Sequence, residues 1–592
     1  MLYKHTNNQK NPRTLYPKKE EQEERIAAQT TQTRKSIVGL EDVKLLSSQL
    51  QEMSYPGATT TLEQSQTTLA NSYVIPRHGL PEDVAYNLVH NELNLDGNPH
   101  LNLASFVNTT TTDIANKLIN ENINKNLADN DEYPQLIELT QRCISMLAQL
   151  WKCSPDLEPI GCATTGSSEA IMLGGLAMKK KWEHRMQDAG KDISKPNIIM
   201  SSACQVALEK FARYFEVECR LVPVSKKSHY MLDPKSLWDY VDENTIGCFV
   251  ILGTTYTGHL ENVEKVADVL TEIENQNPTW SNKDIPIHVD GASGGFIVPL
   301  SFHTDHMKQY GLQRWGFNHP RVVSINTSSH KFGLTTPGLG WVLWKDDSYL
   351  SNELRFRLKY LGGIEETFGL NFSRPGFQVV HQYFNFVSMG LNGYKALFKK
   401  SIFVSRVFAH SLLTSKKMPG YFDIVSSTHE RISDGGIPDY VSDYWDNTQD
   451  YKPGIPLVAF KLSDEFHENF PEIPQAMISS MLRSRGWIIP NYPLPKSTDD
   501  SDQCEVLRVV FRSEMKLDLA QMLLIDIEGI ITKLLYSYTK VSKEAQHMQA
   551  TPESRRSFIY EMLLALASPE EGDTETNPEL KERTSRNYRG TC

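Results

Sequence analysis

The chain has 592 residues, more than a single hydrophobic core accommodates, so two or three domains are expected. Its net charge of −11, with no basic stripe interleaved with aromatic residues, argues against nucleic-acid binding. The eight cysteines are scattered without a CxxC pair, which argues against a disulfide scaffold or a zinc site and favours a reducing compartment.

Residues 1–75 are rich in Gln, Thr, Ser and Lys and show little periodicity, apart from a short helical pattern at 43–53. This composition predicts a mobile extension. Residues 1–36 contain no apolar signal segment, and no run approaches the length of a membrane span. An acidic cluster at 20–24 is unlike a mitochondrial presequence. We therefore expect a cytoplasmic protein that does not enter a membrane.

Periodic structure begins near Leu80. Pro81, Glu82 and Asp83 open a helix that carries apolar residues on one side and ends at the turn signal of residues 96–99. The stretch from 76 to 125 is accordingly expected to form an N-terminal helical segment.

A Gly/Ser/Thr-rich turn follows an amphipathic helix predicted at 133–151. Its sequence, GCATTGSSEA at 161–170, leads into a strongly apolar helix at 170–178. Free backbone N–H groups at the positive end of a helix suit a phosphate group, and Ser167 and Ser168 add hydroxyl donors. The alternative interpretation is an ordinary helix cap, for which Ser168 would also serve.

Apolar strands and helices then alternate along the chain. Strands are predicted at 197–200, 219–224, 248–252, 285–289, 321–326 and 340–344, and helices at 208–215, 234–243 and 263–275. This alternation predicts an α/β domain with a mainly parallel sheet covered by helices on both faces. In open sheets of this kind the active site lies at the C-terminal ends of the strands.

Three chemically suggestive side chains follow such strand ends: Thr255, Asp290 and Lys331. A lysine in a turn after a buried strand is partly desolvated, which lowers its pKa and makes the amine a nucleophile. We predict that Lys331 reacts with the aldehyde of pyridoxal phosphate (PLP) as a Schiff base. Asp290 would then pair with the pyridine N–H⁺ and make the ring an electron sink.

Small polar residues complete this predicted site. Thr255 and His330 would lie near the ring oxygen and the phosphate, and Ser328 belongs to the hydroxyl-rich turn before the lysine. Ala292 lies in the sequence GASGG at 291–295, whose lack of bulk lets the backbone approach a flat ring. Each feature alone is typical of ordinary loops, but together they match what PLP chemistry requires.

A helix predicted from 378 to 400 leads to a smaller α+β domain. Its strands are predicted at 422–426, 457–462, 487–490 and 506–511, and a helix at 476–483. In the last strand Arg508 and Arg512 share one face, with Leu507 and Val509 on the other. An arginine on such a strand clamps a carboxylate bidentately or forms a surface salt bridge, and the pattern leaves both open.

The tail contains one amphipathic segment at 558–567, preceded by Arg555 and Arg556. A calmodulin-type docking helix is one interpretation, which Glu561 weakens; packing on its own or a sister subunit is preferred. The predicted organisation is an extension at 1–75, a helical segment at 76–125, a large PLP-binding domain at 126–395, a small C-terminal domain at 396–545 and a tail at 546–592.

Five motifs closely resemble the glutamate decarboxylases, a family of PLP-dependent group II decarboxylases of fold type I. They are LDGN at 95–98, GSSEA at 166–170, HVD at 288–290, HKFGL at 330–334 and NFSRP at 371–375. The resemblance spans residues 80–536, and the whole chain looks most like the fungal (yeast) members. It implies a seven-stranded-type sheet in the large domain and decarboxylation of L-glutamate to 4-aminobutyrate and CO₂ in glutamate catabolism.

The resemblance also assigns roles to individual residues. It implies that Lys331 carries PLP, that Ser167 and Ser168 hold its phosphate, and that Asp290 pairs with the pyridine nitrogen. Gln205 stands where the family stacks a residue on the ring; many related decarboxylases have His there, whereas plant and bacterial glutamate enzymes have Gln.

The implied substrate site lies partly across a dimer. Arg508 matches the family's arginine for the α-carboxylate. The distal carboxylate pocket is implied at Ser105, Phe106, Asn126 and Asp129. Ser373, with Phe372, is implied to reach the phosphate of a neighbouring subunit. At least a homodimer is therefore expected, with a hexamer as the larger alternative, and no metal is expected at the site.

Two positions depart from the family pattern. Ser329 stands where Gly commonly precedes the His-Lys pair; if that position needs a positive φ, Ser costs about 1 kcal/mol or more. Ser105 replaces the Thr of bacterial members and keeps the hydroxyl. In addition, no histidine follows His547, so the C-terminal histidine gate of acid-induced bacterial members is not assumed.

Alternative functions share part of this pattern. A PLP decarboxylase acting on aspartate, cysteine sulfinate or an aromatic amino acid would also use Lys331, Asp290 and Ser168. The polar pocket implied by Asn126 and Asp129 favours glutamate. A non-catalytic scaffold acting through its tails is the alternative from another class, and the intact lysine and aspartate argue against it.

Overall fold

The computed structural model describes residues 75–76, 79–129, 131–358, 365–495, 504–546 and 551–567. The chain divides into two units, Met1–Asp96 and Gly97–Cys592. The predicted mobile extension and its helical pattern at 43–53 lie outside the described residues, as does the end of the tail beyond residue 567.

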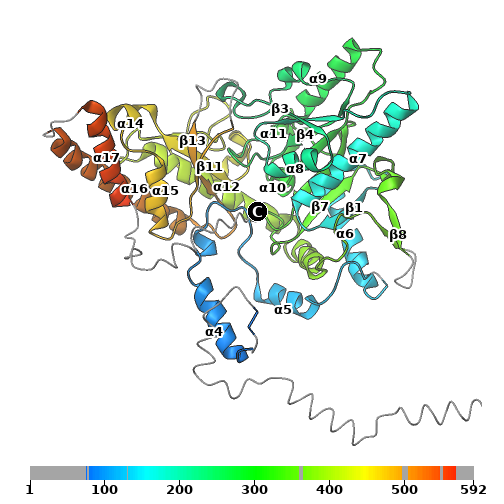
Figure 1. Ribbon diagram of the computed structural model, residues 1–592, viewed down its shortest axis with the longest axis horizontal. Helices are drawn as coiled ribbons and strands as arrows, with labels where there is room; N and C mark the ends of the chain where they lie inside the picture. Colours follow the sequence, from blue (N-terminus) through cyan, green and yellow to red (C-terminus); the bar gives the residue numbers. More distant parts are fainter. Residues whose placement is uncertain are drawn as a thin grey trace, which may run out of the picture. The chain divides into compact units, whose positions relative to one another are not determined.

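A seven-stranded sheet lies at the centre of the large domain (Figure 1). Its strand order is β1-β7-β6-β5-β4-β2-β3. The neighbouring strands from β6 to β3 pair in parallel, whereas β7 is antiparallel to both β1 and β6. The predicted mainly parallel sheet is confirmed. The strands are β1 Ile160–Thr164, β2 Asn197–Ser201, β3 Glu218–Val222, β4 Thr245–Ile251, β5 Ile287–Asp290, β6 Val322–Ser328 and β7 Gly340–Trp344.

Helices cover both faces of this sheet, because successive strand side chains point to opposite faces. In β4, Cys248 and Val250 pack with α6, α9 and α10, whereas Phe249 and Ile251 pack with α7 and α8. These helices are α6 Pro134–Leu150, α7 Ser167–Asp188, α8 Val206–Tyr214, α9 Val263–Gln276 and α10 Gly294–Ser301. The result is the helix–sheet–helix layering expected from the alternating sequence pattern.

Two parts of the large domain differ from the sequence prediction. Residues 234–243 contain only a short 3-10 helix, η3 Pro234–Asp239, in which Leu237 alone is buried, so no apolar stripe supports a longer helix. Strand β1 was not predicted, since its sequence IGCAT has few strongly β-forming residues. Its pairing with β7 supplies the hydrogen bonds that make it a strand.

A long helix, α12 Phe377–Thr414, connects the large domain to the small one and is interrupted at Gly390, which has φ 57°. The predicted domain boundary at residue 395 falls within it. The small domain has an antiparallel sheet of order β10-β11-β13-β12. Its elements are β10 Phe422–Ile424, β11 Leu457–Leu462, β12 Asn491–Pro493, β13 Glu505–Val510, α13 Asp443–Asp446, α14 Asp464–Asn469 and α15 Ala476–Arg483.

The strand predicted at 487–490 does not belong to this sheet. Trp487 and Ile489 are buried, as their apolar character predicts. The backbone of Ile488 instead exchanges hydrogen bonds with Leu101 and Leu103, each at 3.0 Å. The small domain thus uses this extended segment to hold the chain that leads into the large domain.

The C-terminal helices pack on the small domain. Helix α16, Leu517–Gln546, is followed by α17, Pro552–Ala567. Ile559 and Leu563 of α17 are buried in the same cluster as α16, whereas Met562 is exposed. The amphipathic segment predicted at 558–567 thus buries Ile559 and Leu563, whereas its apolar Met562 faces outward. The packing favours the interpretation that this helix docks on its own subunit over a calmodulin-binding helix.

The remaining elements are short or lie near the N-terminus. The predicted helix after Pro81 is present as α4. The other elements are α4 Glu82–Leu93, α5 Asp113–Asn122, α11 Thr304–Lys308, β8 Phe356–Leu358, β9 Glu365–Thr367, and the 3-10 helices η1 Pro99–Leu101, η2 Lys226–Ser228, η4 Asp347–Tyr349, η5 Asn352–Leu354 and η6 Thr448–Asp450.

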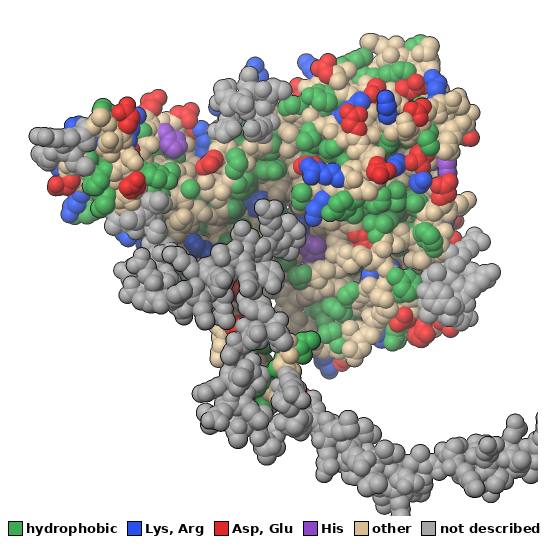
Figure 2. Space-filling view, in the orientation of Figure 1, with side chains coloured by type: hydrophobic (Ala, Val, Ile, Leu, Met, Phe, Trp, Pro, Cys, Tyr) green, Lys and Arg blue, Asp and Glu red, His purple; other side chains and the backbone are tan. Residues whose placement is uncertain are grey.

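The surface carries both positive and negative side chains. Figure 2 shows acidic and basic side chains interspersed over the large domain. Across the described ranges, no helix is both long and apolar enough to cross a bilayer. In the same ranges, no cluster of three or more His, Cys, Asp or Glu side chains could hold a metal ion.

Candidate active site

A cavity of about 410 Å³ opens at the carboxyl ends of the central strands. This is the edge of the sheet at which the sequence pattern places the active site. The cavity brings together most of the predicted site residues: Ser105, Phe106, Ser167, Ser168, Gln205, Thr255, Asp290, Ala292, Ser328, His330 and Lys331.

Lys331 lies in the turn after β6, where its backbone N–H donates to the Ser328 carbonyl at 3.2 Å. Its amine donates to the Ser293 hydroxyl at 3.2 Å. Burial lowers the pKa of Lys331 to about 8, an effect that Asp290 opposes and Arg508 reinforces. About a tenth of the amine is therefore uncharged at pH 7, and the uncharged form is the one that attacks a carbonyl.

The serine before the His-Lys pair does not strain this turn. Ser329 has no positive φ, whereas Leu334, farther along the loop, has φ 65°. Both the Ser329 and His330 N–H groups donate to the Leu339 carbonyl, at 3.0 and 3.4 Å. The expected cost of replacing glycine by Ser329 therefore does not arise.

Asp290 is held in place by hydrogen bonds to one of its two carboxylate oxygens. Its Oδ1 accepts from the backbone N–H of Ala292 and from Nδ2 of Asn326, both at 3.0 Å. Its Oδ2 accepts no hydrogen bond from the described residues, which leaves an acceptor for a positively charged ring N–H.

Asn326 connects Asp290 to a buried histidine that sequence reasoning did not assign. The Asn326 Oδ1 accepts from Nε2 of His288 at 2.7 Å, and Nδ1 of His288 pairs with the Ser324 hydroxyl at 2.7 Å. Burial lowers the pKa of His288 to about 4, so the ring is neutral near pH 7. The motif HVD alone does not reveal this contact, because Asn326 comes from the neighbouring strand.

The turn before α7 presents the open N-terminus of a helix to the cavity. Gly166 is the N-cap residue, with φ 151°, and no side chain caps the helix. The alternative interpretation of Ser168 as an N-cap is therefore wrong. The Ser167 hydroxyl contacts the Ser328 hydroxyl, which brings the turn next to the end of β6. Free N–H groups beside two serine hydroxyls fit a phosphate group.

Glu169 holds this turn in position, a role that the sequence pattern did not indicate. Its carboxylate accepts from the Thr165 N–H at 2.8 Å and from the Thr165 hydroxyl at 3.0 Å. The same carboxylate accepts from the backbone and side-chain N–H groups of Asn371, each at 3.1 Å. Buried Glu169 thus ties the turn to the segment that contains Ser373.

Gln205 and His330 line the cavity between these anchors. The Gln205 Oε1 accepts from the Ala207 N–H at 2.6 Å, which caps α8 and fixes the amide. Burial, with the Lys331 charge in second place, lowers the pKa of His330 to about 4. Both side chains are therefore uncharged near neutral pH and suit a neighbouring aromatic ring.

Arg508 reaches the cavity wall from the small domain. Its guanidinium donates to the Thr255 carbonyl at 2.7 Å and to the Ala104 carbonyl. It lies over two aromatic rings, 5.0 Å from the centroid of Phe106 and 5.4 Å from that of Tyr492. No carboxylate of the described residues pairs with this cation, so it can receive the carboxylate of a ligand.

The Ser105 hydroxyl is used within its own turn, where it accepts from the Val107 N–H at 3.1 Å. The remaining predicted residues do not line the cavity. Asn126 donates to Asp129 at 3.0 Å and to the Ser373 hydroxyl at 3.4 Å, so the three form a separate cluster. The structure therefore divides the predicted site residues into a cavity group and this outlying group.

The cavity group fits PLP in three independent respects. The open helix end beside Ser167 and Ser168 suits the phosphate, the free oxygen of Asp290 suits a protonated ring nitrogen, and the Lys331 amine suits the aldehyde. These three features lie around one cavity of a size that small-molecule sites commonly have.

Comparison with known proteins supports this reading of the geometry. Residues 78–431 match the family model described as the pyridoxal-dependent decarboxylase conserved domain. The chain is 70% identical to a glutamate decarboxylase of Saccharomyces cerevisiae over 94% of this chain and 97% of that protein.

Solved structures agree in fold. A Lactobacillus brevis glutamate decarboxylase superposes with a TM-score of 0.68 at 34% identity, covering 79% of this chain and 96% of the other. The Oryza sativa protein TDC, solved with PLP and tryptamine, superposes with a TM-score of 0.61 at 16% identity, covering 84% of this chain and 99% of the other. At that identity the second similarity concerns the fold alone.

Proposed function

Since the chain belongs to the pyridoxal-dependent decarboxylase family, we propose that it removes the α-carboxylate of L-glutamate and releases CO₂ and 4-aminobutyrate. It is a PLP-dependent carboxy-lyase. The observation that carries the chemistry is the single cavity that joins the Lys331 amine, the Asp290 carboxylate and the open end of α7. Similarity to glutamate decarboxylases supports glutamate as the substrate.

PLP, when bound, supplies a ring that accepts the electron pair left behind by departing CO₂. Lys331 provides the amine to which the cofactor attaches, and its lowered pKa makes that amine reactive. Asp290 would place its carboxylate toward the ring nitrogen, and Asn326 and the Ala292 N–H hold that carboxylate in orientation. Ser167, Ser168, Ser328, Thr255 and His330 are proposed to surround the phosphate and the ring oxygen.

Arg508 is proposed to bind the α-carboxylate of the substrate. Its guanidinium is fixed by two carbonyls and two rings, so it orients a bound carboxylate without first having to become ordered. The Phe106 ring is close to both cations, with the Lys331 amine 5.1 Å and the Arg508 guanidinium 5.0 Å from its centroid. The ring would exclude water from the bond that breaks.

The outlying cluster of Asn126, Asp129 and Ser373 is proposed to complete the site of a second subunit in a homodimer. It supplies polar groups for the distal carboxylate and the phosphate, and it does not reach its own chain's cavity. Mixing Lys331→Ala chains with Asn126→Ala/Ser373→Ala chains tests this. Shared sites would recover activity that neither variant has alone, whereas no recovery would contradict the exchange.

We also place the protein in the cytoplasm, in keeping with the thiols of its seven cysteines at described positions, all of which are free. The function is tested by an absorbance spectrum of the purified protein, followed by assays for CO₂ and 4-aminobutyrate with glutamate. Aspartate, cysteine sulfinate and aromatic amino acids serve as competing substrates. A protein without the cofactor band would support the scaffold alternative instead.

A further inference from the structure

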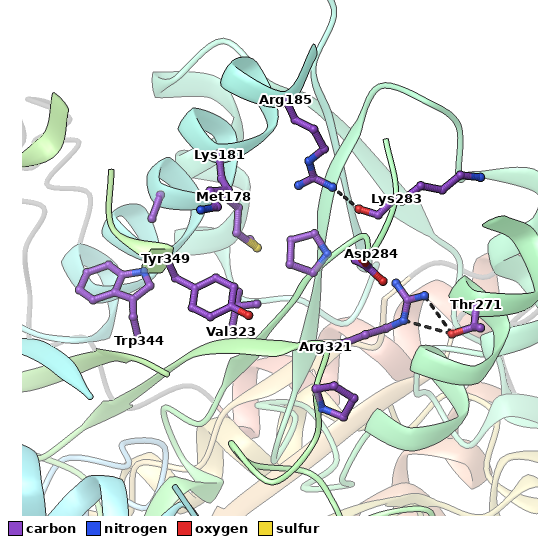
Figure 3. Close-up of a pocket in the computed structure, with 13 residues that line it drawn as sticks. Met178, Lys181, Arg185, Thr271, Lys283, Asp284, Arg321, Val323, Trp344 and Tyr349 are labelled. Carbon is purple, nitrogen blue, oxygen red and sulfur yellow. Dashed lines mark hydrogen bonds between the residues drawn. The ribbon is translucent and has the colours of Figure 1, made fainter. Parts of the chain in front are cut away.

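A second and larger cavity, of about 720 Å³, lies at the opposite edge of the same sheet (Figure 3). Pro286 and Arg321 precede β5 and β6, and Trp344 ends the antiparallel β7, so the cavity is at the amino ends of the parallel strands. It shares no lining residue with the cofactor cavity. Its volume is within the range of small-molecule sites.

The interior of this cavity is apolar and partly aromatic. Met178 of α7, Val323 of β6 and the rings of Trp344 and Tyr349 form its walls, and Figure 3 shows the Tyr349 ring beside Val323. Pro286 adds a further apolar surface. Such walls favour a ligand with a flat apolar body.

Two cations of α7 line the cavity without a carboxylate partner. Lys181 and Arg185 are one helical turn apart and therefore share a face. The Lys181 amine donates to the Ser348 carbonyl at 2.8 Å, and Arg185 donates to the Lys283 carbonyl. Neither forms an ion pair with an acidic side chain of the described residues, so both can pair with the carboxylate of a ligand.

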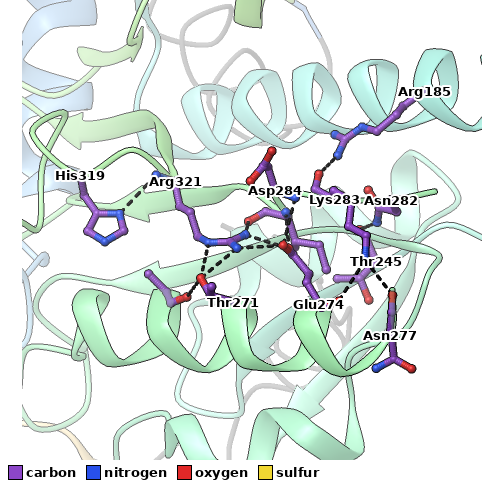
Figure 4. A network of polar contacts seen from close by, with 12 residues as sticks. Arg185, Thr245, Thr271, Glu274, Asn277, Asn282, Lys283, Asp284, His319 and Arg321 are labelled. Atoms are coloured by element: carbon purple, nitrogen blue, oxygen red, sulfur yellow. Dashed lines mark hydrogen bonds and ion pairs between the residues drawn. The ribbon is translucent and has the colours of Figure 1, made fainter. Parts of the chain in front are cut away.

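Of the other two basic residues that line the cavity, Arg321 differs in this respect. Arg321 pairs with Glu274 through two hydrogen bonds of 2.8 and 2.9 Å and also bonds to Thr271 and the Ile285 carbonyl (Figure 4). Its charge is thus neutralised, and the network makes it a rigid part of the wall. Lys283, the fourth basic residue of the lining, has no carboxylate partner among the described residues and donates to the Glu274 and Asn277 carbonyls at 2.9 and 2.7 Å.

The aromatic walls add an unused donor. The indole Nε1 of Trp344 is buried and has no hydrogen-bond acceptor within the part of the chain that the structure describes. A buried donor without an acceptor is uncommon in native proteins, because it loses its hydration without compensation.

We propose that this cavity is a ligand site for a small amphipathic anion, with a flat apolar body and one carboxylate. The carboxylate is received by Arg185 and Lys181, whose charges are otherwise unpaired, and the apolar body packs against Trp344, Tyr349 and Met178. A doubly charged phosphate is less suited, because the Asp284 carboxylate also lines the cavity. The site is independent of the decarboxylation proposed above.

Binding of 1-naphthylacetate to the PLP-loaded protein, measured by isothermal titration calorimetry, tests the proposal. The neutral 1-naphthylacetamide is the matched ligand control. We expect the acid to bind at least about tenfold more tightly than the amide, since only the acid satisfies the two cations. Saturating L-glutamate should leave this binding unchanged, because glutamate occupies the other edge of the sheet.

Variants locate the site. Arg185→Gln and Lys181→Gln should each weaken binding of the acid by roughly tenfold. Lys180→Gln is the control, since Lys180 pairs with Glu183 at 2.7 Å and does not line the cavity. All three should keep wild-type cofactor absorbance and activity. Absence of binding, equal affinity for acid and amide, displacement by glutamate or unchanged affinity in both cavity variants would each overturn the proposal.

Discussion

The two edges of the central sheet are built from the same elements but differ in how their lysine and arginine side chains are surrounded. At the carboxyl edge, Lys331 has the Asp290 carboxylate nearby, and Arg508 is tied to two carbonyls. At the amino edge, Lys181 and Arg185 have only single carbonyl partners. The comparison indicates that burial of an amine makes it a reactive group, whereas accessible cations without carboxylate partners make a place for binding.

The strongest test of this contrast removes the reactive amine. Lys331→Ala should lower decarboxylation by at least about 10³-fold, because no other amine lines the cavity. The absorbance band of the lysine-bound cofactor should disappear as well. Lys181→Ala at the other edge is the matched control and should retain both properties. An active Lys331→Ala protein would refute the assignment.

The next test removes a charge at each edge without changing shape. Asp290→Asn should lower kcat by about 10²-fold or more, because the ring nitrogen loses its anionic partner. Asp284→Asn removes the corresponding carboxylate at the amino edge. Asp284 has φ 55°, which asparagine tolerates, so activity should stay within about twofold of wild type. Equal losses in the two variants would mean that overall charge, rather than contact with the ring, matters.

The pH dependence of stability measures the burial of Lys331 directly. In the cofactor-free protein its pKa falls from 10.5 to about 8, so below pH 8 the folded state holds a buried charge that the unfolded state solvates. Between pH 8 and 10.5 the folded state loses this proton first, and the penalty disappears. Lys331→Met should therefore be more stable than wild type by about 3 kcal/mol at pH 7 and equally stable above about pH 10.5.

Denaturant unfolding of both apoproteins at a series of pH values checks this expectation. A stability difference that does not change with pH would show that packing, and not the buried charge, distinguishes the two proteins. Lys181→Met provides the comparison at the other edge, where the amine is exposed and donates to the Ser348 carbonyl.

The smallest effect concerns a residue that positions Asp290. Asn326→Ala removes the 3.0 Å donation to the carboxylate and should lower kcat by about tenfold. Ser324→Ala breaks the hydrogen bond at the far side of His288 and should change kcat by less than about twofold. The absorbance maximum of the bound cofactor should shift in Asn326→Ala alone if the asparagine acts through Asp290.

Much of the large domain could be predicted because its strands are continuous apolar runs followed by polar turns. Asp290 and Lys331 were found in this way, since each follows a buried strand. Strand β1 could not be found, because small residues become a strand there only through pairing with β7. The position of residues 487–490 was missed for the same reason, since their partners near Leu101 are distant in sequence.

Single residues of the site show the same limit. Gln205 and Ser105 are identified as site residues only by family resemblance. In the structure, the side-chain oxygen of each accepts a backbone N–H two residues later and fixes the local chain. Asn326 and Glu169 were missed because their partners lie on other segments of the chain. Local sequence identifies the chemical groups, whereas their orientation depends on contacts between distant segments.

The pairing of β7 sets the spacing of the two anchors of the cofactor site. One rung of the sheet aligns Thr164 of β1, Gly340 of β7 and Ser328 of β6. The turn before α7 follows β1, and the loop that contains Lys331 follows β6, so the two lie on either side of β7 although they are far apart in sequence. Because β7 lies between them, neither anchor has its final spacing until this strand inserts. Cofactor retention therefore reports that the sheet has been completed, and it offers a simple colour assay for correct folding of newly made chains.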